Sequence, residues 1–281
     1  MNFRKLFSKS LVILAVLGFA SCSDDDSSPT VAPLINTPNV TGYSKLTSVE
    51  RSGVFVNKCA WNFVYKGENL SSAVSTLQHS SNLETEGKKT NFSLTYGENY
   101  VGVKTDGSQI SLTLNEDVLV DKAMSGNTTY NYSYTGGYLT SWNVVYKNDG
   151  FAGSSTKGAM AEIGRSLTGN ITSIKYTPSA DAAEDYYLYS FEYDDQLNYN
   201  GLLPECLSTE LGCDGFECLY YAGLFGNGTR NVMKSMEVTH SKREDYHVKY
   251  DFNYNTDGYG NIVLCSYGAI ENPIVVTYKY Y

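Results

Sequence analysis

The chain has 281 residues, 30 of them acidic and 21 basic, which gives a formal net charge of −9 at pH 7. This balance argues against nucleic acid as a partner, because phosphates need a basic surface, and it disfavours anionic lipid headgroups. Tyrosine is the outlier of the composition, with 25 copies. Its apolar body and polar tip suit pleated, half-buried surfaces, so the composition favours a β-rich protein.

The first 21 residues have the pattern of an export signal. Basic residues at the start are followed by an apolar run at 11–19. This run is too short to span a bilayer, which takes about 20 apolar residues. It ends in Phe-Ala-Ser before Cys22, which resembles the lipobox of bacterial lipoproteins, where the chain is cut before the cysteine and its sulfur carries diacylglycerol. We therefore predict lipidation of Cys22; an ordinary secretory signal with Cys22 incidental is the alternative.

Residues 22–41 are predicted to be a tether. Ser-Asp-Asp-Asp at 23–26 resembles the acidic signal that sends Bacteroidetes lipoproteins to the cell surface, and a solvated spacer is the alternative. Prolines at 29, 33 and 38 favour an extended linker. No later apolar segment is long enough to cross a membrane as a helix. We expect a lipid-anchored, surface-exposed protein of the outer membrane, with a single domain over 42–281.

Alternation of apolar and polar residues with period two recurs through this domain. Such alternation predicts strands with one apolar and one polar face, as in antiparallel sheets. The predicted strands lie at 59–65, 92–96, 110–114, 130–134, 142–146, 187–193, 248–254 and 274–280.

Glycine-containing turns join these segments. Gly136-Gly137 and Asp257-Gly258 stand between alternating runs, which predicts hairpins. Residues 201–228 break the alternation and are predicted to form a short helix and loop that cover one end of the sheet. A helical turn is also predicted at 159–163. The fold class is therefore all-β, an antiparallel meander of hairpins that forms a barrel or half-barrel.

Several short motifs carry a family resemblance. They are the lipobox with its acidic sequel, Tyr-Leu-Thr-Ser-Trp at 138–142, Gly-Asn-Ile-Thr at 169–172, the aromatic strand at 189–193 followed by Asn198, Gly-Leu-Phe-Gly at 223–226, and 254–259. Together they resemble a family of Bacteroidetes lipoproteins of unknown function with a porin-like fold. The resemblance implies a barrel-like antiparallel fold over about 45–281, and no activity. Charged and amide residues in mid-strand favour a soluble barrel over a membrane-inserted one.

Five cysteines remain after lipidation: Cys59, Cys206, Cys213, Cys218 and Cys265. An exported protein can form disulfides, and the odd number leaves at least one cysteine outside any internal pair. The three central cysteines are close in sequence, so we predict a local bridge among them. Their spacing does not match a zinc site.

Three sets of residues could form a metal or catalytic site. Asn253, Asn255 and Asp257 fit the opening of a calcium loop, but the closing glutamate is absent, and an ordinary hairpin turn is the alternative. His240 and His247 flank a predicted turn and could form a metal-binding pair; the alternative is that they are two exposed histidines at strand ends. Carboxylates that could serve glycoside hydrolysis are Glu192 with Asp194 or Asp195, and Asp251 with Asp257. No cofactor is predicted.

Aromatic side chains are the better candidates for a binding site, because tyrosine and tryptophan faces stack on sugar rings. Trp61, Trp142, Tyr220 and Tyr221 are the candidates, with a place in the core as the alternative for each. The predicted function is non-enzymatic binding of a glycan or envelope component. The alternatives are a structural or interaction subunit beside an outer-membrane protein, and a glycoside hydrolase without a recognisable motif.

Overall fold

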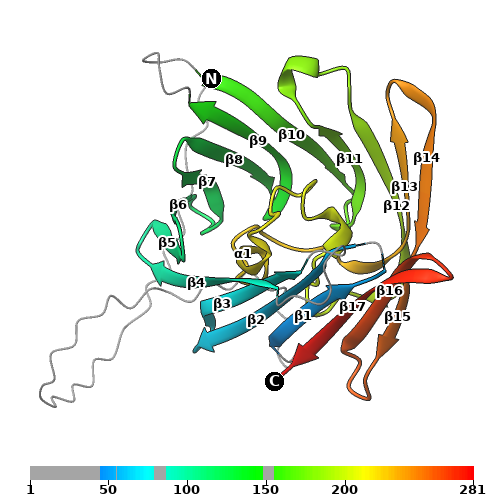
Figure 1. Cartoon of the computed structure of the whole chain (residues 1–281), viewed down its shortest axis with the longest axis horizontal. Coiled ribbons are helices and arrows are strands. Elements are labelled where there is room, and N and C mark those ends of the chain that lie inside the picture. The colour runs from blue at the N-terminus through cyan, green and yellow to red at the C-terminus, as the bar shows by residue number, and fades with distance from the viewer. Residues whose placement is uncertain (1–44, 55, 79–86, 148–154) are drawn as a thin grey trace, which may run out of the picture. The chain divides into compact units, whose positions relative to one another are not determined.

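Seventeen antiparallel strands form one sheet that curls into a nearly closed barrel (Figure 1). The computed structural model describes residues 45–54, 56–78, 87–147 and 155–281. The strands are β1 Leu46–Ser52, β2 Lys58–Lys66, β3 Asn69–Gln78, β4 Lys88–Tyr96, β5 Tyr100–Thr105, β6 Gln109–Leu114, β7 Val120–Ser125, β8 Thr128–Thr135, β9 Tyr138–Lys147, β10 Ser155–Arg165, β11 Ile171–Thr177, β12 Tyr187–Leu197, β13 Asn231–His240, β14 Arg243–Asp251, β15 Asn253–Thr256, β16 Ile262–Ala269 and β17 Asn272–Tyr280. The helices are η1 Ala180–Ala182, η2 Glu205–Leu207 and α1 Glu217–Tyr221. The predicted all-β class is confirmed.

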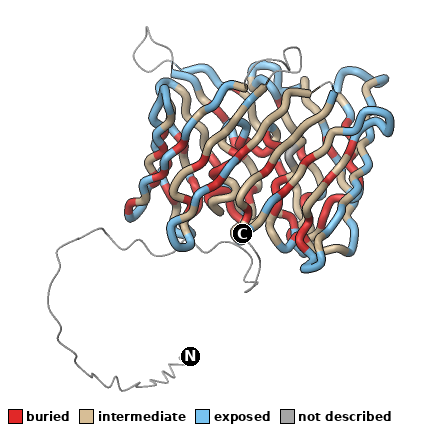
Figure 2. The backbone as a smooth tube through the Cα atoms, turned by 60° about the horizontal axis from the view of Figure 1, so that its bottom comes forward, coloured by how far each residue is buried: buried red, intermediate tan, exposed pale blue. Residues whose placement is uncertain are grey.

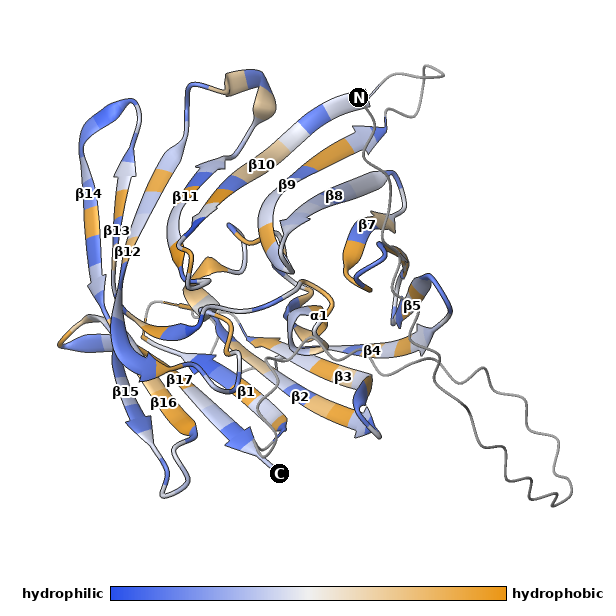
Figure 3. Ribbon diagram, turned by 180° about the vertical axis from the view of Figure 1, so that it is seen from behind, coloured by the Kyte–Doolittle hydropathy of each residue, from blue (hydrophilic) through white to orange (hydrophobic). Residues whose placement is uncertain are grey.

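The alternation in sequence becomes the two faces of the wall. In β6, Ile110, Leu112 and Leu114 are buried while the residues between them are exposed. Figure 3 shows the same alternation of apolar and polar stretches along the other strands. The apolar side chains face the lumen and pack there, which removes their surface from water and stabilises the barrel. The outer wall carries mainly serine, threonine, asparagine and charged residues, with scattered exposed apolar side chains such as Val64, Met124 and Leu188.

The helical turn predicted at 159–163 is wrong, because these residues lie within β10. Ala161 and Ile163 are buried and Glu162 between them is exposed. This is the period of a strand, and a run of five residues is too short to distinguish from a helical turn by periodicity.

The pairing of β1 with β17 joins the first and last strands and closes the sheet on itself, and one strand bends between its two neighbours. β1 pairs with β2 and with β17, and β9 pairs with β10. β14 and β15 are two halves of one strand that bends at Phe252: β14 pairs with β13, whereas β15 pairs with β16. Among the described residues, none pairs with the second edge of β14, and the wall is incomplete at this point.

The two ends of the barrel differ. β1 begins beside the end of β17, with Leu46 opposite Tyr280, and successive strands then alternate in direction. The turns at 67–68, 97–99, 115–119, 166–170 and 257–261 therefore lie at the same end as Lys45 and Tyr281; we call it the closed end. The opposite end, with the turns at 106–108, 241–242 and 270–271, is the open end.

Residues 198–230, which we call the plug, fill the lumen at the closed end. Leu203, Leu207, Leu219 and Leu224 of the plug are at most 1% exposed. The wall binds the plug directly, since Tyr132 Oη donates to Gly212 O at 2.8 Å and Val120 N donates to Leu224 O at 2.9 Å. The prediction that this irregular segment covers one end is confirmed, and the lumen is blocked there.

All described residues belong to one compact unit, Val31–Tyr281. Within the described part of the chain, none of the helices has the length and apolar character needed to cross a membrane.

Candidate functional site

A cavity of about 270 Å³ opens into the lumen near the open end. Its walls come from the inner faces of β12, β13, β14 and β16, and its floor comes from the plug. Its lining residues include Tyr189, Glu210, Tyr246, Val248, Tyr250 and Tyr267. β12 and β14 bring tyrosines together because tyrosine recurs at inward-facing positions on both strands, and β16 adds Tyr267.

Glu210 is the acidic group of the cavity floor. Its Oε1 accepts a hydrogen bond of 2.6 Å from Tyr189 Oη, whereas its buried Oε2 has no hydrogen-bond partner among the described residues. Burial raises the pKa of Glu210, and the nearby carboxylate of Asp214 raises it further. A buried carboxylate oxygen without a donor is costly, so a donor from a ligand or water would stabilise it.

Two tyrosine hydroxyls complete the polar lining. Tyr246 and Tyr250 are half-buried, and neither hydroxyl bonds to any described residue. The rings are held by edge-to-face contacts, with 6.1 Å between the centroids of Tyr250 and Tyr267 and 5.6 Å between those of Tyr187 and Tyr246. The cavity thus presents fixed aromatic surfaces, two hydroxyls and a carboxylate oxygen.

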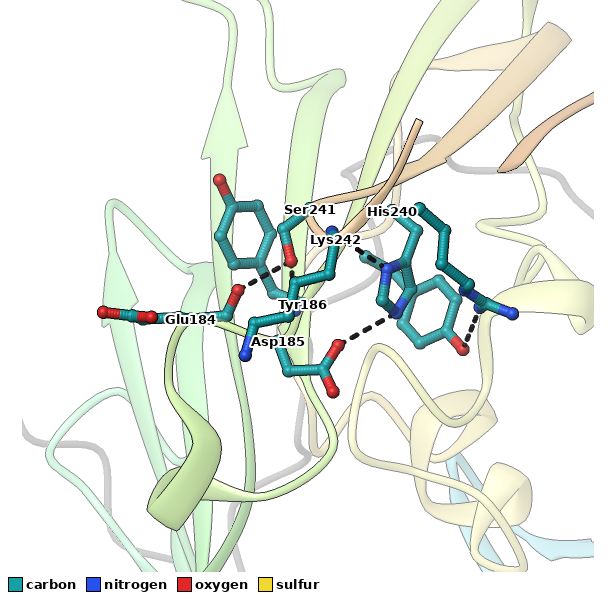
Figure 4. Close-up of polar contacts among 8 residues, drawn as sticks. Glu184, Asp185, Tyr186, His240, Ser241 and Lys242 are labelled. Atoms are coloured by element: carbon teal, nitrogen blue, oxygen red, sulfur yellow. Dashed lines mark hydrogen bonds and ion pairs between the residues drawn. The ribbon is translucent and has the colours of Figure 1, made fainter. Parts of the chain in front are cut away.

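The rim above the cavity is held by a polar cluster (Figure 4). His240 Nε2 lies 3.0 Å from Asp185 Oδ1, and Ser241 Oγ donates to Glu184 O at 2.7 Å. These contacts join the turn between β13 and β14 to the connection at 178–186. They fix the open-end termini of β12 and β14, the strands that carry Tyr187 and Tyr246.

Arg243 closes the same rim from the other side. Its guanidinium lies 4.5 Å from the Tyr246 ring centroid and donates to Tyr187 Oη at 3.0 Å. This cation–π contact holds the Tyr246 ring beside the cavity that it lines. Arg51, from the end of β1, also lines the cavity, so the site holds charges of both signs.

The two histidines considered as a metal pair bind different carboxylates. The His240 side chain is 7% exposed and contacts Asp185, whereas His247 is 57% exposed and lies 3.6 Å from Glu237. Within the part of the chain that the structure describes, no group of three or more histidine, cysteine or acidic side chains could hold a metal ion.

The two tryptophans predicted as ligand contacts lie in the core. Trp61 is 2% exposed and Trp142 is 4% exposed. Trp142 Nε1 donates to Glu210 O at 2.7 Å, so this indole supports the cavity floor from below. Neither ring presents a face to the cavity.

The two predicted tyrosines lie in α1, inside the plug. Tyr220 and Tyr221 are half-buried, with 5.7 Å between their perpendicular rings, and Tyr221 lies 5.3 Å from Phe63. They pack against the core, and the cavity is lined by other tyrosines. The aromatic faces of β12 and β14 were visible in the sequence, but alternation alone did not distinguish a packed lumen from an open one.

The residues of the candidate calcium loop form a turn. Asp257 Oδ1 accepts from the backbone N–H of Tyr259 at 2.8 Å and of Asn261 at 2.9 Å, and Oδ2 accepts from Asn261 Nδ2 at 2.9 Å. The Asn261 side chain lowers the pKa of Asp257. Asn253 and Asn255 are exposed on β15. These contacts match an ordinary turn closed by an aspartate.

The predicted local disulfide is wrong: no bridge joins any of the five cysteines that the structure describes. Cys213 and Cys218 are buried within the plug, and burial raises the pKa of the Cys218 thiol. They fill core volume as small apolar side chains.

The carboxylate pairs considered for glycoside hydrolysis lie outside the cavity. Glu192 and Asp194 are exposed on β12, where Glu192 Oε2 accepts from Ser235 Oγ at 3.0 Å. Asp251 is exposed on β14. Glu210 could not be recognised from the sequence, because only the folded plug places it in the cavity.

The fold matches solved structures of porin-like proteins. One, from Bacteroides uniformis, superposes with a TM-score of 0.67 at 14% identity, over 84% of this chain and 98% of that one. Another, from Bacteroides vulgatus, has a TM-score of 0.56 at 10% identity, over 85% and 99% of the two chains. No protein-family model and no curated protein matches the sequence. The likeness defines the class of fold, an antiparallel porin-like barrel, and no specific activity.

Proposed function

We propose that this protein is a lipid-anchored, non-enzymatic binding protein of the outer-membrane surface, which holds a glycan in the tyrosine-lined cavity. The observation that carries the proposal is the buried Oε2 of Glu210, without a partner among the described residues, below Tyr246 and Tyr250. Sugar hydroxyls donate to such an oxygen, and sugar rings stack on aromatic faces. Because the plug blocks the lumen at the closed end, the barrel is better suited to binding a ligand that enters from the open end than to letting one pass through.

The outer wall supports a barrel that stands outside the bilayer. A transmembrane barrel presents an apolar band to lipid. Here the exposed positions in mid-wall include Lys104, Asn143 and Glu162. The exported, lipidated N-terminus inferred from the sequence would then supply the membrane attachment.

The test is binding of the mature chain, made with Cys22→Ser so that it carries no lipid, across a panel of host and dietary polysaccharides by affinity electrophoresis. We expect retardation by at least one polysaccharide. Tyr246→Ala should weaken that binding about tenfold, as loss of a central aromatic contact does. Glu210→Gln should weaken it further, because an amide nitrogen in place of Oε2 cannot accept a hydrogen bond from a sugar hydroxyl, while the amide oxygen can still accept from Tyr189 Oη.

The matched control is Tyr259→Ala. Tyr259 is 91% exposed in the 257–261 turn of the closed end, far from the cavity. It should bind as the parent does. Retardation by no polysaccharide, or equal losses for Tyr246→Ala and Tyr259→Ala, would exclude the cavity as a glycan site.

A glycoside hydrolase is the second candidate, favoured by the raised pKa of Glu210 beside Asp214. A general acid for glycoside cleavage has a raised pKa of this kind. New reducing ends after incubation with the bound polysaccharide, lost in Glu210→Gln, would establish hydrolysis in place of simple binding.

The interaction-subunit alternative has weaker support. It calls for a sheet edge suited to pairing with another chain. The second edge of β14 has no partner among the described strands, but the pairing of β13 with β14 shifts register between Thr239 and His240. Lys249 and Asp251 are exposed along it. Bulges and charged residues are features that protect edges against pairing.

A further inference from the structure

A second cavity, of about 550 Å³, lies at the closed end, away from the glycan site. It is lined by the start of β9, the 166–170 turn, the end of β12 and the last residues of the plug. The side chains that matter are Tyr138, Leu167, Tyr199 and Arg230. We call it the closed-end groove.

Leu167 stands at the edge of this groove and is 109% exposed. Its turn is firmly held, since Gly169 N donates to Ser166 O at 3.0 Å and Arg165 Nη1 donates to Gly169 O at 2.9 Å. A Cβ on Gly169 would lie 2.4 Å from Tyr138 Oη, so the turn also packs closely on the groove wall. A leucine held in this way at the edge of a groove would gain burial energy if a partner surface covered it.

Tyr199 is also held beside the groove by hydrogen bonds of the backbone around it, where β12 leads into the plug. Leu202 N donates to Asn198 Oδ1 at 2.9 Å, and Asn198 N donates to Arg230 O at 2.8 Å. These bonds fix Tyr199, which is 37% exposed, beside the groove. Tyrosine with an apolar body and a wet tip is typical of the boundary between lipid and water.

Arg230 supplies a cation at the groove. It is exposed, and it forms no ion pair with any residue that the structure describes. An arginine guanidinium matches phosphate oxygens in charge and geometry. An apolar rim beside an unpaired guanidinium fits a phospholipid, whose chains are apolar and whose headgroup carries phosphate.

The course of the chain brings lipid to this end. Tyr281 N donates to Lys45 O at 3.0 Å, so the described chain begins and finishes together at the closed end. The chain between Cys22 and Lys45 can span at most about 80 Å, at about 3.5 Å per residue. A lipid on Cys22 would thus lie within reach of the closed-end groove.

We infer that the closed end is a membrane-contact surface, on which Leu167 and Tyr199 enter the interface of a zwitterionic phospholipid layer and Arg230 binds a phosphate. This inference rests on the lipid anchor proposed above. The net negative charge of the chain disfavours an anionic membrane, and zwitterionic lipid supplies the phosphate without that repulsion. The contact is interfacial, in which a few side chains enter the headgroup region.

The test is flotation of the mature chain carrying Cys22→Ser with vesicles of phosphatidylcholine and phosphatidylethanolamine. Without its own lipid, the protein can associate only through its surface. We expect measurable partition, reduced about tenfold by Leu167→Ser through loss of one buried leucine side chain. Arg230→Gln should reduce it about threefold.

The matched control is Ile270→Ser. Ile270 is 98% exposed in the 270–271 turn of the open end, so the change in exposed apolar surface is similar and only the position differs. It should leave partition unchanged. No partition of the parent protein, or equal losses for Leu167→Ser and Ile270→Ser, would overturn the inference. Absence of lipid on Cys22 in cells would contradict the proposed anchor, and absence of retardation by glycans would contradict the proposed cavity site. Neither outcome would change the result of the vesicle flotation.

Discussion

The closed and open ends are built from the same strands, yet they differ in what fills them. At the closed end, plug leucines such as Leu207 and Leu224 are fully buried. At the open end, Tyr246, Val248 and Tyr250 face the lumen and are only half-buried. Figure 2 shows buried segments concentrated in the half of the barrel nearest the C-terminus. The closed end holds most of the packed core, and the open end keeps aromatic surface accessible.

This difference indicates that the closed end mainly stabilises the fold, whereas the open end is available for binding. A packed core tolerates little change, because voids and strain are costly. A half-buried aromatic wall contributes less to folding and remains available to a ligand, as binding surfaces commonly do. If this division holds, equivalent substitutions should have large effects on unfolding at the closed end and small ones at the open end.

The largest expected effect is on the plug. Leu207 is 0% exposed, and Leu207→Ala should lower the free energy of unfolding by about 2–5 kcal/mol, through lost burial and the cavity left behind. Val248→Ala, on the half-buried inner face of β14, should cost about 1 kcal/mol or less. Urea denaturation of both variants measures the contrast. Similar costs at the two positions would show that the open end is part of the packed core.

A smaller effect is expected at a close contact between plug and wall. Gly212 has a φ of +67°, and a Cβ there would lie 2.7 Å from the Trp142 ring. Gly212→Ala should cost about 2–3 kcal/mol, from backbone strain and a clash with a rigid indole. Gly215 has a similar φ of +75° with no atom within 4 Å of its Cβ, so Gly215→Ala should show the strain alone, about 1 kcal/mol. The difference in Tm between Gly212→Ala and Gly215→Ala measures the clash with the Trp142 ring. Equal losses of Tm would mean that the plug packs loosely against Trp142.

The strands were largely predictable, because a half-buried strand has a local signature. β6 and β12 alternate so regularly that their inner faces are evident without coordinates. The irregular plug was also visible, as a break in that alternation. What failed locally was the interpretation of 159–163, where the five residues Ala-Met-Ala-Glu-Ile are too few to distinguish the period of a strand from that of a helix.

The site was not predictable for a different reason. Trp142 and Tyr246 occupy the same kind of inward-facing position, yet one lies against the plug and the other lies above it. The depth to which the plug fills the lumen depends on contacts between residues far apart in sequence. One of these is the bond from Trp142 Nε1 to Glu210 O, across 68 positions. Glu210 becomes a cavity residue only through such contacts.

The third prediction concerns the pH dependence of stability. Burial raises the pKa of Glu210, so the folded state binds its proton more tightly than the unfolded state does. The parent protein should therefore lose stability as pH rises from the unfolded pKa through the folded pKa. Glu210→Gln removes this loss. Its Tm should match the parent near pH 4 and exceed it by about 2 °C at pH 7, measured by calorimetry. A variant less stable than the parent at pH 7 would mean that the carboxylate is well solvated or paired in the lumen.

The smallest effects should come from removing one hydroxyl at each end. Tyr132 is 4% exposed, and Tyr132→Phe should cost about 1 kcal/mol because it leaves Gly212 O without its donor. Tyr246→Phe removes a hydroxyl that bonds to no described residue, so the free energy of unfolding should change by less than about 0.5 kcal/mol. The same substitution should weaken glycan binding if that hydroxyl contacts the ligand. A stability loss at Tyr246 equal to that at Tyr132 would mean that both tyrosines serve the fold, and the distinction between the two ends would fail.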